Sequence, residues 1–465
     1  MMNNFSKIGF ILAALGSSIG LGHIWRFPYI AGTNGGGAFV LLYLFLALTI
    51  GIAMLVGEML IGNKGKANAF KSYENLDPSP SKKWRYAGLT LIGGPIILSF
   101  YAIVLGWVFY YLFMVSFNLP SDMESSGAVF GELYKNGFVP QTLGLLFVMG
   151  LTGWIISRGV KRGIELLNLI LTPLLFIIFF GLLIYAMSMD SFGRAVEFML
   201  SFDMQEAKKA LSLDVFVDSL GQVFFSLSLG VGIIITYAAN SDSNQNLLKS
   251  SLWIVLSGIA IAIMAGLMIF TFVFEYEGVV NKGTGLIFVT LPVMFSHLGI
   301  LGNIIAFLFL IAFSFAGITS TISLLEPAVM YMSETYGWSR AKATWSITLA
   351  IIALGMVIVC SICTPAAEYL AIGGKSLMDI IEFLSANFIM SIGGLLAVIF
   401  IGWVVPKEKL QVYTSHFFGN LGFNVWYYLM RYVTPLITII ILLAKIAEFF
   451  MGEDAVKSII ESMGL

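Results

Sequence analysis

Long stretches of apolar residues, separated by shorter polar segments, run through the whole chain. A membrane-spanning helix needs about 20 mainly apolar residues, and the stretches are close to that length or longer. The first stretch contains Trp25 and Arg26 and lacks the small-residue cleavage site of a signal peptide, so we expect it to be retained. The pattern predicts an all-α membrane protein with eleven transmembrane helices, at residues 7–31, 36–61, 86–117, 141–157, 163–188, 213–239, 247–275, 301–331, 343–362, 377–405 and 422–450.

Positive charge is unevenly divided between the two sets of connections. Sixteen of the 25 Lys and Arg residues fall on the side of the 62–85 connection, and eight fall on the opposite side. The positive-inside rule therefore predicts a cytoplasmic N-terminus and, with eleven spans, an extracytoplasmic C-terminus. The connections at 118–140, 189–212 and 276–300 are long enough for short helices, and 451–465 is predicted to form a short interfacial helix.

Composition supports a membrane protein and argues against several other classes. Hydrophobic residues make up 58% of the chain and charged residues 11%, against roughly 25% charged in globular proteins. The net charge of −1 gives no reason to expect a nucleic-acid partner. Two cysteines, Cys360 and Cys363, lie in an apolar run, and the three histidines, His23, His297 and His416, lie far apart. We therefore expect neither a redox pair nor a metalloenzyme, and no enzyme of any class.

Spans 1 and 6 are each interrupted by a cluster of Gly and Ser, at residues 16–22 and 226–232. Glycine weakens a helix by about 1 kcal/mol relative to alanine, so each cluster is a place where the helix can open. Close helix packing is an alternative interpretation of Gly16 and Gly20, which are four residues apart. Two breaks at corresponding positions favour a 5+5 inverted repeat around a site near the middle of the membrane.

The predicted organisation is one transmembrane domain over 1–465. We expect the first five-helix repeat at 7–188, the second, inverted repeat at 213–405, and an eleventh helix at 422–450. The half-helix N-termini at the two breaks would face an anion, and the freed carbonyls would face a cation.

The residues around the breaks resemble the neurotransmitter:sodium symporter family. The resemblance rests on five segments in order: 20–29 (GLGHIWRFPY), 34–39 (NGGGAF), 101–107 (YAIVLGW), 221–230 (GQVFFSLSLG) and 316–320 (AGITS). The span count is similar to that of the family's prokaryotic eleven-span amino-acid transporters. The resemblance implies a LeuT-type fold with discontinuous helices 1 and 6, and sodium-driven uptake of a small molecule by alternating access.

The family has two sodium sites, and the second has a complete set of matching positions in this chain. They are the backbone carbonyls of Gly16, Ile19 and Ala316 and the hydroxyls of Thr319 and Ser320. Oxygen ligands suit a hard cation. We expect one Na⁺ here.

The first sodium site departs from the family pattern. Ser18 and Ser226 match, but His23 and Gly258 stand where the family has two asparagine ligands. We expect a degenerate site in which His23, with an ordinary pKa near 6.5, supplies a positive charge or a proton beside the substrate. The alternative is a neutral His23 bonded to span 7 or to a water. Ala262 stands at the family's chloride position, so no chloride is expected.

The resemblance also implies the residues of the substrate site. Gly20 stands where monoamine carriers of the family have aspartate, which favours an amino acid, and Val231 leaves room for a branched or aromatic side chain. The predicted substrate-binding residues are Ser17, Gly20, Leu21, Gly22, Ile97, Tyr101, Phe225, Ser226, Ser228, Val231, Ser320, Ser323 and Leu324.

The predicted gates differ in how well they match the family. Arg26 and Glu382 match its outer gate pair, with Phe225 as the aromatic lid. On the inner side the family's N-terminal arginine and tryptophan have no counterpart, and Glu334 stands near the position of their carboxylate partner.

The sequence therefore predicts a sodium-coupled symporter in the plasma membrane of a prokaryote, importing a hydrophobic or aromatic amino acid, as a monomer or homodimer. One alternative is a sodium-coupled carrier of another solute, such as a β- or γ-amino acid or an amine. A channel or sensor is a further alternative, but one inverted repeat does not provide the symmetric ring of ligands expected of a pore.

Overall fold

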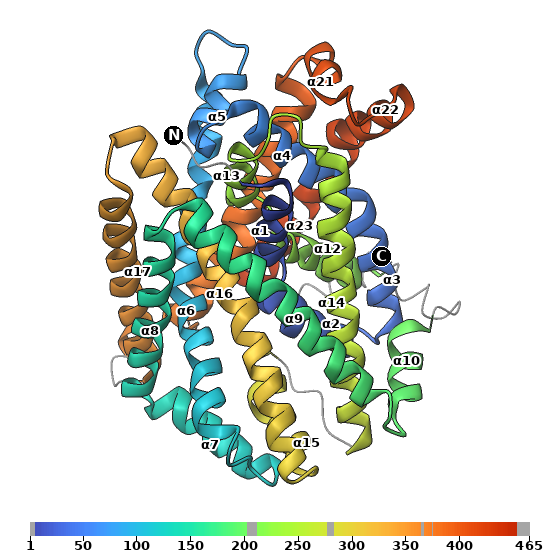
Figure 1. Ribbon diagram of the computed structural model, residues 1–465, viewed down its shortest axis with the longest axis vertical. Coiled ribbons are helices and arrows are strands. Elements are labelled where there is room, and N and C mark those ends of the chain that lie inside the picture. The colour runs from blue at the N-terminus through green and yellow to red at the C-terminus, as the bar shows by residue number, and fades with distance from the viewer. Residues whose placement is uncertain (1–4, 202–211, 277–282, 364–366, 374, 453–465) are drawn as a thin grey trace.

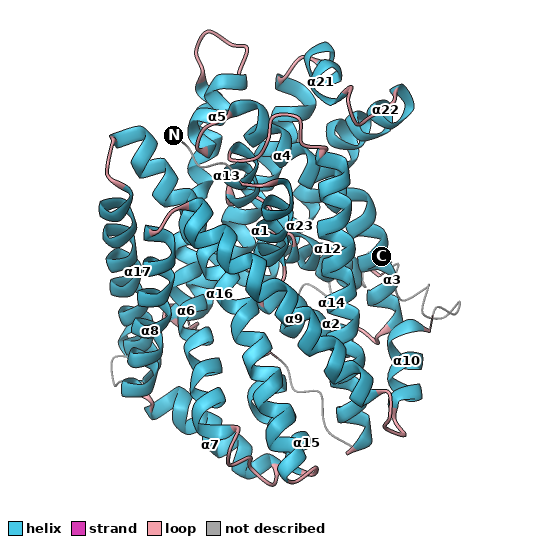
Figure 2. Cartoon of the chain, in the orientation of Figure 1, coloured by secondary structure: helices cyan, strands magenta, loops and turns pink. Residues whose placement is uncertain are grey.

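The structure is a computed structural model that describes residues 5–201, 212–276, 283–363, 367–373 and 375–452. Within these ranges the regular elements are helices, joined by short loops (Figure 2). The α-helices of the first half are α1 (Lys7–Ser18), α2 (Phe27–Thr33), α3 (Gly37–Leu46), α4 (Ile52–Gly65), α5 (Ala69–Leu76), α6 (Gly93–Tyr110), α7 (Met123–Asn136), α8 (Phe138–Ser157), α9 (Leu166–Ala186) and α10 (Phe192–Leu200). Those of the second half are α12 (Leu213–Ser226), α13 (Ile233–Ala239), α14 (Leu247–Glu275), α15 (Leu291–Ser296), α16 (Ile300–Tyr336), α17 (Arg340–Cys363), α18 (Ala367–Leu370), α19 (Leu377–Glu382), α20 (Met390–Ile399), α21 (Lys407–Thr414), α22 (Asn420–Tyr428) and α23 (Thr434–Met451).

Turns of 3₁₀ or π geometry continue several of these helices. They are η1 (Gly22–Arg26), η2 (Ala47–Gly51), η3 (Lys83–Ile92), η4 (Tyr111–Val115), η5 (Val160–Glu165), η6 (Leu286–Thr290), η7 (Phe383–Ile389), η8 (Phe400–Val404) and η9 (Leu429–Val433).

The described residues contain nine continuous helices that are long and apolar enough to cross a membrane. A tenth span is the pair Lys7–Ser18 and Gly22–Thr33, which is bent by 49° at its break. Helices α12 and α13, separated at Leu227–Gly232, occupy the predicted position of the sixth span and bring the number to the eleven that hydropathy predicts. The all-helical, eleven-span architecture with discontinuous helices 1 and 6 is thus confirmed.

The polar connections also form helices. Helices α7 and α10 lie in the first two long connections and α15 in the third, as their lengths led us to expect. The interfacial helix predicted at 451–465 falls almost entirely on residues 453–465, which lie outside the described ranges.

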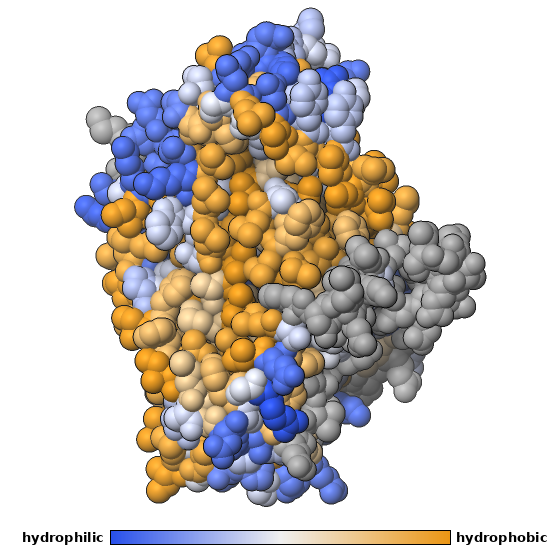
Figure 3. Space-filling view, turned by 90° about the vertical axis from the view of Figure 1, so that its right-hand side faces the viewer, coloured by the Kyte–Doolittle hydropathy of each residue, from blue (hydrophilic) through white to orange (hydrophobic). Residues whose placement is uncertain are grey.

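The two broken spans lie inside the helical assembly. Helix α1 packs against α9, α14 and α16, while α12 packs against α3 and α13 against α4 (Figure 1). Apolar side chains cover the middle of the molecule, and polar residues gather toward its two ends (Figure 3). Large apolar side chains such as Phe180, Trp253 and Leu349 are exposed on the outer helices. This surface fits a bilayer, whose hydrocarbon core is about 30 Å thick.

Candidate functional site: a cavity between two helix breaks

The first break exposes backbone groups between α1 and η1. Helix α1 ends at Ser18, and η1 begins only at Gly22. The carbonyl oxygen of Ser17 accepts hydrogen bonds from Ser228 Oγ at 3.1 Å and from Ser320 Oγ at 3.4 Å. The Ser17 carbonyl, which the break exposes, is therefore hydrogen-bonded to the second break and to α16. Inside a bilayer such backbone groups must find partners within the protein.

The second break lies between α12 and α13 and has an unusual backbone. Ser228, Gly230 and Gly232 have φ values of 54°, 86° and 74°. The Gly230 N–H donates a 2.7 Å hydrogen bond to Oε1 of Glu58, a residue of α4 that is 1% exposed. Sequence reasoning missed Glu58, although an ionisable residue within an apolar span was itself a signal of function.

A cavity of about 40 Å³ lies between the two breaks. Twelve of the thirteen predicted substrate-binding residues line it, and Ser18, Ile233 and Met390 line it in addition. Ser226 is not among the lining residues, because its hydroxyl lies 3.3 Å from the Tyr43 hydroxyl on the far side of the break. Most of the predicted substrate residues are therefore brought together around one small space.

One end of this cavity is polar. The Leu21 N–H points at the Tyr101 hydroxyl oxygen at 3.4 Å. A Cβ atom at Gly20 would lie 3.0 Å from that hydroxyl oxygen and closer still to Ser320 Oγ, so a side chain at Gly20 would fill this end. Apolar side chains, among them Ile97 and Val231, also line the cavity. An amide and a hydroxyl together with apolar lining suit a molecule with an anionic and a nonpolar end.

The residues predicted for the second sodium site lie beside this cavity. Thr319 Oγ1 is 2.8 Å from the Gly16 carbonyl oxygen and 3.0 Å from that of Ala316. Ser320 is the next residue on α16, and Ile19 is the first residue after α1. Several oxygen atoms therefore converge between α1 and α16, which is the donor set that a sodium ion prefers.

His23, which the sequence assigns to a degenerate first sodium site, lies inside the protein. Its ring is fully buried, with Nδ1 2.8 Å from the Ser18 carbonyl oxygen and Nε2 3.4 Å from the Tyr43 hydroxyl. Because a carbonyl oxygen only accepts, Nδ1 carries a proton. A Cβ atom at Gly258 would lie 2.7 Å from Nε2, so the glycine leaves the room that the imidazole occupies. The two residues that differ from the family pattern, His23 and Gly258, therefore fit each other in size.

The predicted outer gate residues face a second, larger cavity of about 360 Å³. Arg26, Phe225 and Glu382 all line it, and the Arg26 guanidinium lies 4.9 Å from the centre of the Phe225 ring. Within the described part of the chain, the ion pairs closer than 4.0 Å do not include one between Arg26 and Glu382. Arg26 and Glu382 therefore line the same cavity but form no ion pair across it.

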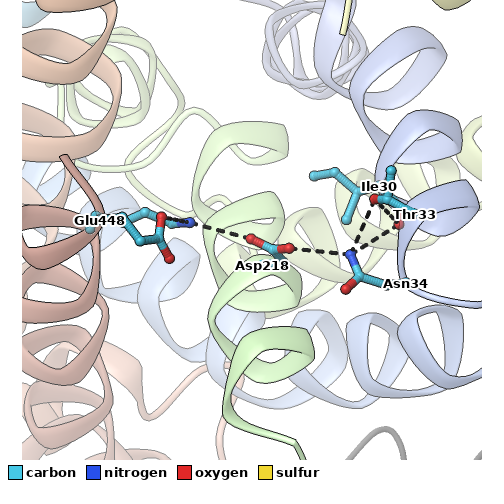
Figure 4. Close-up of polar contacts among 6 residues, drawn as sticks. Ile30, Thr33, Asn34, Asp218 and Glu448 are labelled. Atoms are coloured by element: carbon cyan, nitrogen blue, oxygen red, sulfur yellow. Dashed lines mark hydrogen bonds and ion pairs between the residues drawn. The ribbon is translucent and has the colours of Figure 1, made fainter. Parts of the chain in front are cut away.

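A chain of polar contacts joins the end of α2 to α12 and α23 (Figure 4). Asp218 on α12 accepts a 3.2 Å hydrogen bond from Asn34 Nδ2 at the end of α2. It also lies 3.3 Å from Lys445 Nζ on α23, which in turn contacts Glu448 at 2.7 Å. Hydropathy predicted none of these contacts, because they join helices distant in sequence.

Glu334 and the N-terminal segment each join elements that are distant in sequence. Glu334 Oε2 accepts hydrogen bonds from the backbone N–H of Asn68 at 2.7 Å and from its side chain at 2.9 Å, so it joins α16 to the start of α5. Near the N-terminus, the Phe5 N–H donates to the Asn240 carbonyl at 2.9 Å, and the Phe5 ring packs edge-on against Tyr237. These contacts fix the segment before α1 against the loop that follows α13.

Comparison with known proteins agrees with this geometry. The chain matches the model of the sodium:neurotransmitter symporter family over residues 3–125 and 131–455. It is 34% identical to the uncharacterized sodium-dependent transporter YhdH of Bacillus subtilis, covering 94% of this chain and 96% of that protein. It is 22% identical to the sodium-dependent nutrient amino acid transporter 1 of Drosophila mojavensis, covering 95% of this chain and 75% of that one.

A solved structure has the same fold. The crystal structure of MhsT in complex with L-phenylalanine superposes with a TM-score of 0.85 at 33% identity, covering 95% of this chain and 99% of that one. With its apolar spans, its two broken helices and a match over nearly its whole length, the chain is a multi-pass membrane protein that belongs to the sodium:neurotransmitter symporter family, which consists of sodium-dependent transporters and not of enzymes.

Proposed function

We propose that this protein imports an amino acid with a hydrophobic or aromatic side chain, driven by one sodium ion at the second site. The observation that carries the proposal is the cavity between the breaks, which is lined by the Leu21 amide, the Tyr101 hydroxyl and apolar side chains such as Ile97. The oxygen atoms of Gly16 and Thr319 adjoin it. The bound L-phenylalanine in the similar structure of MhsT supports the same substrate class.

Alternating access would use the two cavities in turn. The outer cavity, with Arg26 and Glu382, would admit the substrate, and Phe225 would close over it. The distribution of Lys and Arg supports a cytoplasmic N-terminus, and similarity to a transporter of Bacillus subtilis supports a prokaryotic plasma membrane. We also propose that the two five-helix repeats lie at 7–188 and 213–405. The assembly would be a monomer or a homodimer.

Thermal stability of the purified protein tests this function. Common amino acids would be added one at a time, in sodium and in potassium. We expect a few apolar amino acids to raise the melting temperature in sodium, since a ligand at a hundredfold excess over its Kd stabilises by about 2.7 kcal/mol. Stabilisation by β- or γ-amino acids or amines alone would favour the alternative carrier. No sodium-specific shift with any solute would contradict the proposal.

We further propose that His23 replaces the first sodium ion. Its Nδ1–H points at the Ser18 carbonyl, which the family uses as a sodium ligand, and the ring occupies the space beside Gly258. An N–H donor satisfies this carbonyl as a cation would. The proton on His23 would thus satisfy the Ser18 carbonyl in place of a sodium ion. Neither a second sodium ion nor a chloride ion would then be needed.

Substitutions at His23 and Gly258 test this replacement. We expect His23→Asn alone to weaken substrate binding at least tenfold, because asparagine does not fill the space of the imidazole. His23→Asn combined with Gly258→Asn should restore binding and raise the Hill coefficient for sodium from about one toward two. Sodium and pH dependence that stay the same in both variants would contradict the role of His23.

A further inference from the structure

Two cationic side chains meet four aromatic rings where the tenth span ends and the eleventh begins. We refer to these six residues as the basic-aromatic cluster: Trp403, Lys407, Tyr427, Tyr428, Arg431 and Tyr432. The Lys407 ammonium lies 5.0 Å from the ring centre of Tyr427 and 4.9 Å from that of Tyr428. The Arg431 guanidinium lies 4.3 Å from the ring centre of Trp403 and 5.7 Å from that of Tyr427. Both cations therefore adjoin the Tyr427 ring.

Several contacts hold Arg431 in place. The Trp403 Nε1–H donates a 2.8 Å hydrogen bond to the Arg431 carbonyl oxygen, and the Arg431 guanidinium donates to the Tyr427 hydroxyl. A Cβ atom at Gly402 would lie 2.8 Å from Arg431 Cα, so η8 and η9 touch at this point. The Tyr432 ring lies 5.7 Å from the guanidinium and meets the Trp403 ring edge-on. The cluster is therefore already ordered, which lowers the entropic cost of binding a ligand.

The two positive charges of the cluster have no carboxylate against them. By contrast, Arg340 at the start of α17 forms an ion pair with Glu326. Within the part of the chain that the structure describes, the ion pairs closer than 4.0 Å include neither Lys407 nor Arg431, although Glu408 follows Lys407 directly. The aromatic rings attract cations but carry no net charge. An anion between the two cations would therefore relieve their mutual repulsion.

The cluster is open at one end of the molecule. Lys407 begins α21, and Tyr428 ends α22; both helices lie at the same end as α5 (Figure 1). The distribution of Lys and Arg assigns this end to the cytoplasmic side. Trp403, Tyr428 and Tyr432 are 55%, 49% and 54% exposed. Because Trp and Tyr rings favour the headgroup level of a bilayer, we expect the cluster to face the lipid headgroups of the inner leaflet.

An apolar stripe continues from the cluster along α23. Val433, Leu436, Ile439 and Leu443 are between 40% and 61% exposed. Their spacing of three or four residues places them on one side of the helix, over about 15 Å. Only 17% of the most apolar part of this span is buried, the smallest share among the nine continuous spans of the described residues. A lipid whose headgroup contacts the cluster could therefore lay its acyl chains on the stripe.

We propose that the basic-aromatic cluster binds one anionic phospholipid, whose phosphodiester lies between Lys407 and Arg431 and whose acyl chains lie along Leu436 and Leu443. The guanidinium presents a planar fork that matches two phosphate oxygens. The ammonium, on its flexible four-carbon stem, approaches the same phosphate from α21. A zwitterionic lipid would bring its own ammonium group toward the two cations, so the site selects a headgroup with net negative charge. The bound lipid joins the inner ends of spans 10 and 11.

Lipid-dependent stability of the detergent-purified full chain tests the site. Mixed micelles would supply phosphatidylglycerol or phosphatidylcholine with the same acyl chains. The melting temperature would be measured together with the number of lipids retained in native mass spectra. We expect phosphatidylglycerol to raise the melting temperature, with one molecule retained per chain, and phosphatidylcholine to have a smaller effect. Glycerol phosphate carries the same anionic group without acyl chains and should not stabilise the protein.

Removing the two cations should remove this preference. We expect Lys407→Gln or Arg431→Gln alone to weaken phosphatidylglycerol binding about fivefold, and the double variant about 25-fold, because each basic residue near an anionic lipid contributes roughly a factor of five. The matched control is Lys161→Gln with Arg162→Gln, which removes two exposed cations of η5 on the same side of the protein. This control should respond to lipid as the wild type does.

Three results would overturn the site. They are equal losses in the two double variants, which would mean that charge acts over the whole inner surface; equal stabilisation by the two lipids; and stabilisation by glycerol phosphate, which would indicate a soluble anion. Arg431→Gln also loses the hydrogen bond to Tyr427 and so could unfold the protein. Lys407→Gln alters only contacts with aromatic rings, and Arg431→Lys keeps the charge. The first should still lower the lipid preference, and the second should keep it.

Discussion

Replacing Thr319 by valine and Ser320 by alanine is expected to weaken sodium binding by about a hundredfold or more and to abolish sodium-driven uptake. Each change removes one hydroxyl beside the Gly16 and Ser17 carbonyls. A hydrogen-bonding partner of a charged group contributes about 1.5–3 kcal/mol, and 1.4 kcal/mol corresponds to a factor of ten. The measurement is the half-saturating sodium concentration for uptake and for thermal stabilisation.

The matched control for this pair is Thr321→Val on the same helix. Thr321 is equally buried, but its hydroxyl is directed away from α1 and lies 2.8 Å from that of Thr152 on α8. We expect this variant to lose some stability and to keep the sodium dependence of the wild type. An unchanged half-saturating concentration in the Thr319→Val and Ser320→Ala variant would show that the ion binds elsewhere.

Removing the charge of Arg340 is expected to destabilise the protein strongly. The Arg340 guanidinium makes a two-pronged contact with Glu326, at 3.0 and 2.5 Å, and its Nε–H donates to the Ile156 carbonyl at 2.7 Å. Glu326 is 1% exposed. Arg340→Met leaves this carboxylate buried and alone, which costs about 3–5 kcal/mol. Melting temperature and yield of monodisperse protein measure the loss.

A double variant distinguishes the buried charge from lost packing. Arg340→Met combined with Glu326→Leu removes both charges, and replacing a buried pair by apolar side chains is often neutral or stabilising. We therefore expect the double variant to recover most of the stability. Lys342→Met, at an exposed position two residues further along α17, should change stability by about 0.5 kcal/mol or less. Equal losses in the single and double variants would exclude the unpaired charge as the cause.

Hydropathy was sufficient for the architecture, because the thickness of the bilayer fixes the length of each span. The breaks in spans 1 and 6 were also predictable, because Gly and Ser clusters recur at corresponding positions of the two spans, whereas one cluster alone could equally serve close helix packing. The left-handed conformation of Ser228, with φ of 54°, was not predictable, because serine rarely adopts it. The surrounding structure imposes it, through the hydrogen bonds that Ser17 and Glu58 make with this segment.

For the site, too, local motifs predicted the residues but not the contacts between helices that are distant in sequence. The motif around Gly20 and the pair Thr319 and Ser320 predicted which residues meet at the cavity. His23 and Gly258 were each interpreted as a lost ligand, yet in the structure one side chain fills the space that the other leaves. Likewise, Glu58 and Gly230 are 172 positions apart, so no local pattern could pair them. Both pairs of residues meet only because particular faces of two helices lie in contact, which the sequence of either helix alone does not reveal.

The barriers on the two sides of the binding cavity differ in thickness. Leu21, Tyr101 and Phe225 each line both the inner and the outer cavity, so a single layer of side chains separates them. Toward the N-terminus, the barrier includes the 12 residues of α1, a length of about 18 Å. Exposed side chains change rotamer within nanoseconds, and Phe225 is only partly buried, whereas shifts of whole helices take microseconds to milliseconds. Loading from outside should therefore be fast and reversible, and turnover should be limited by the steeply temperature-dependent step that displaces α1.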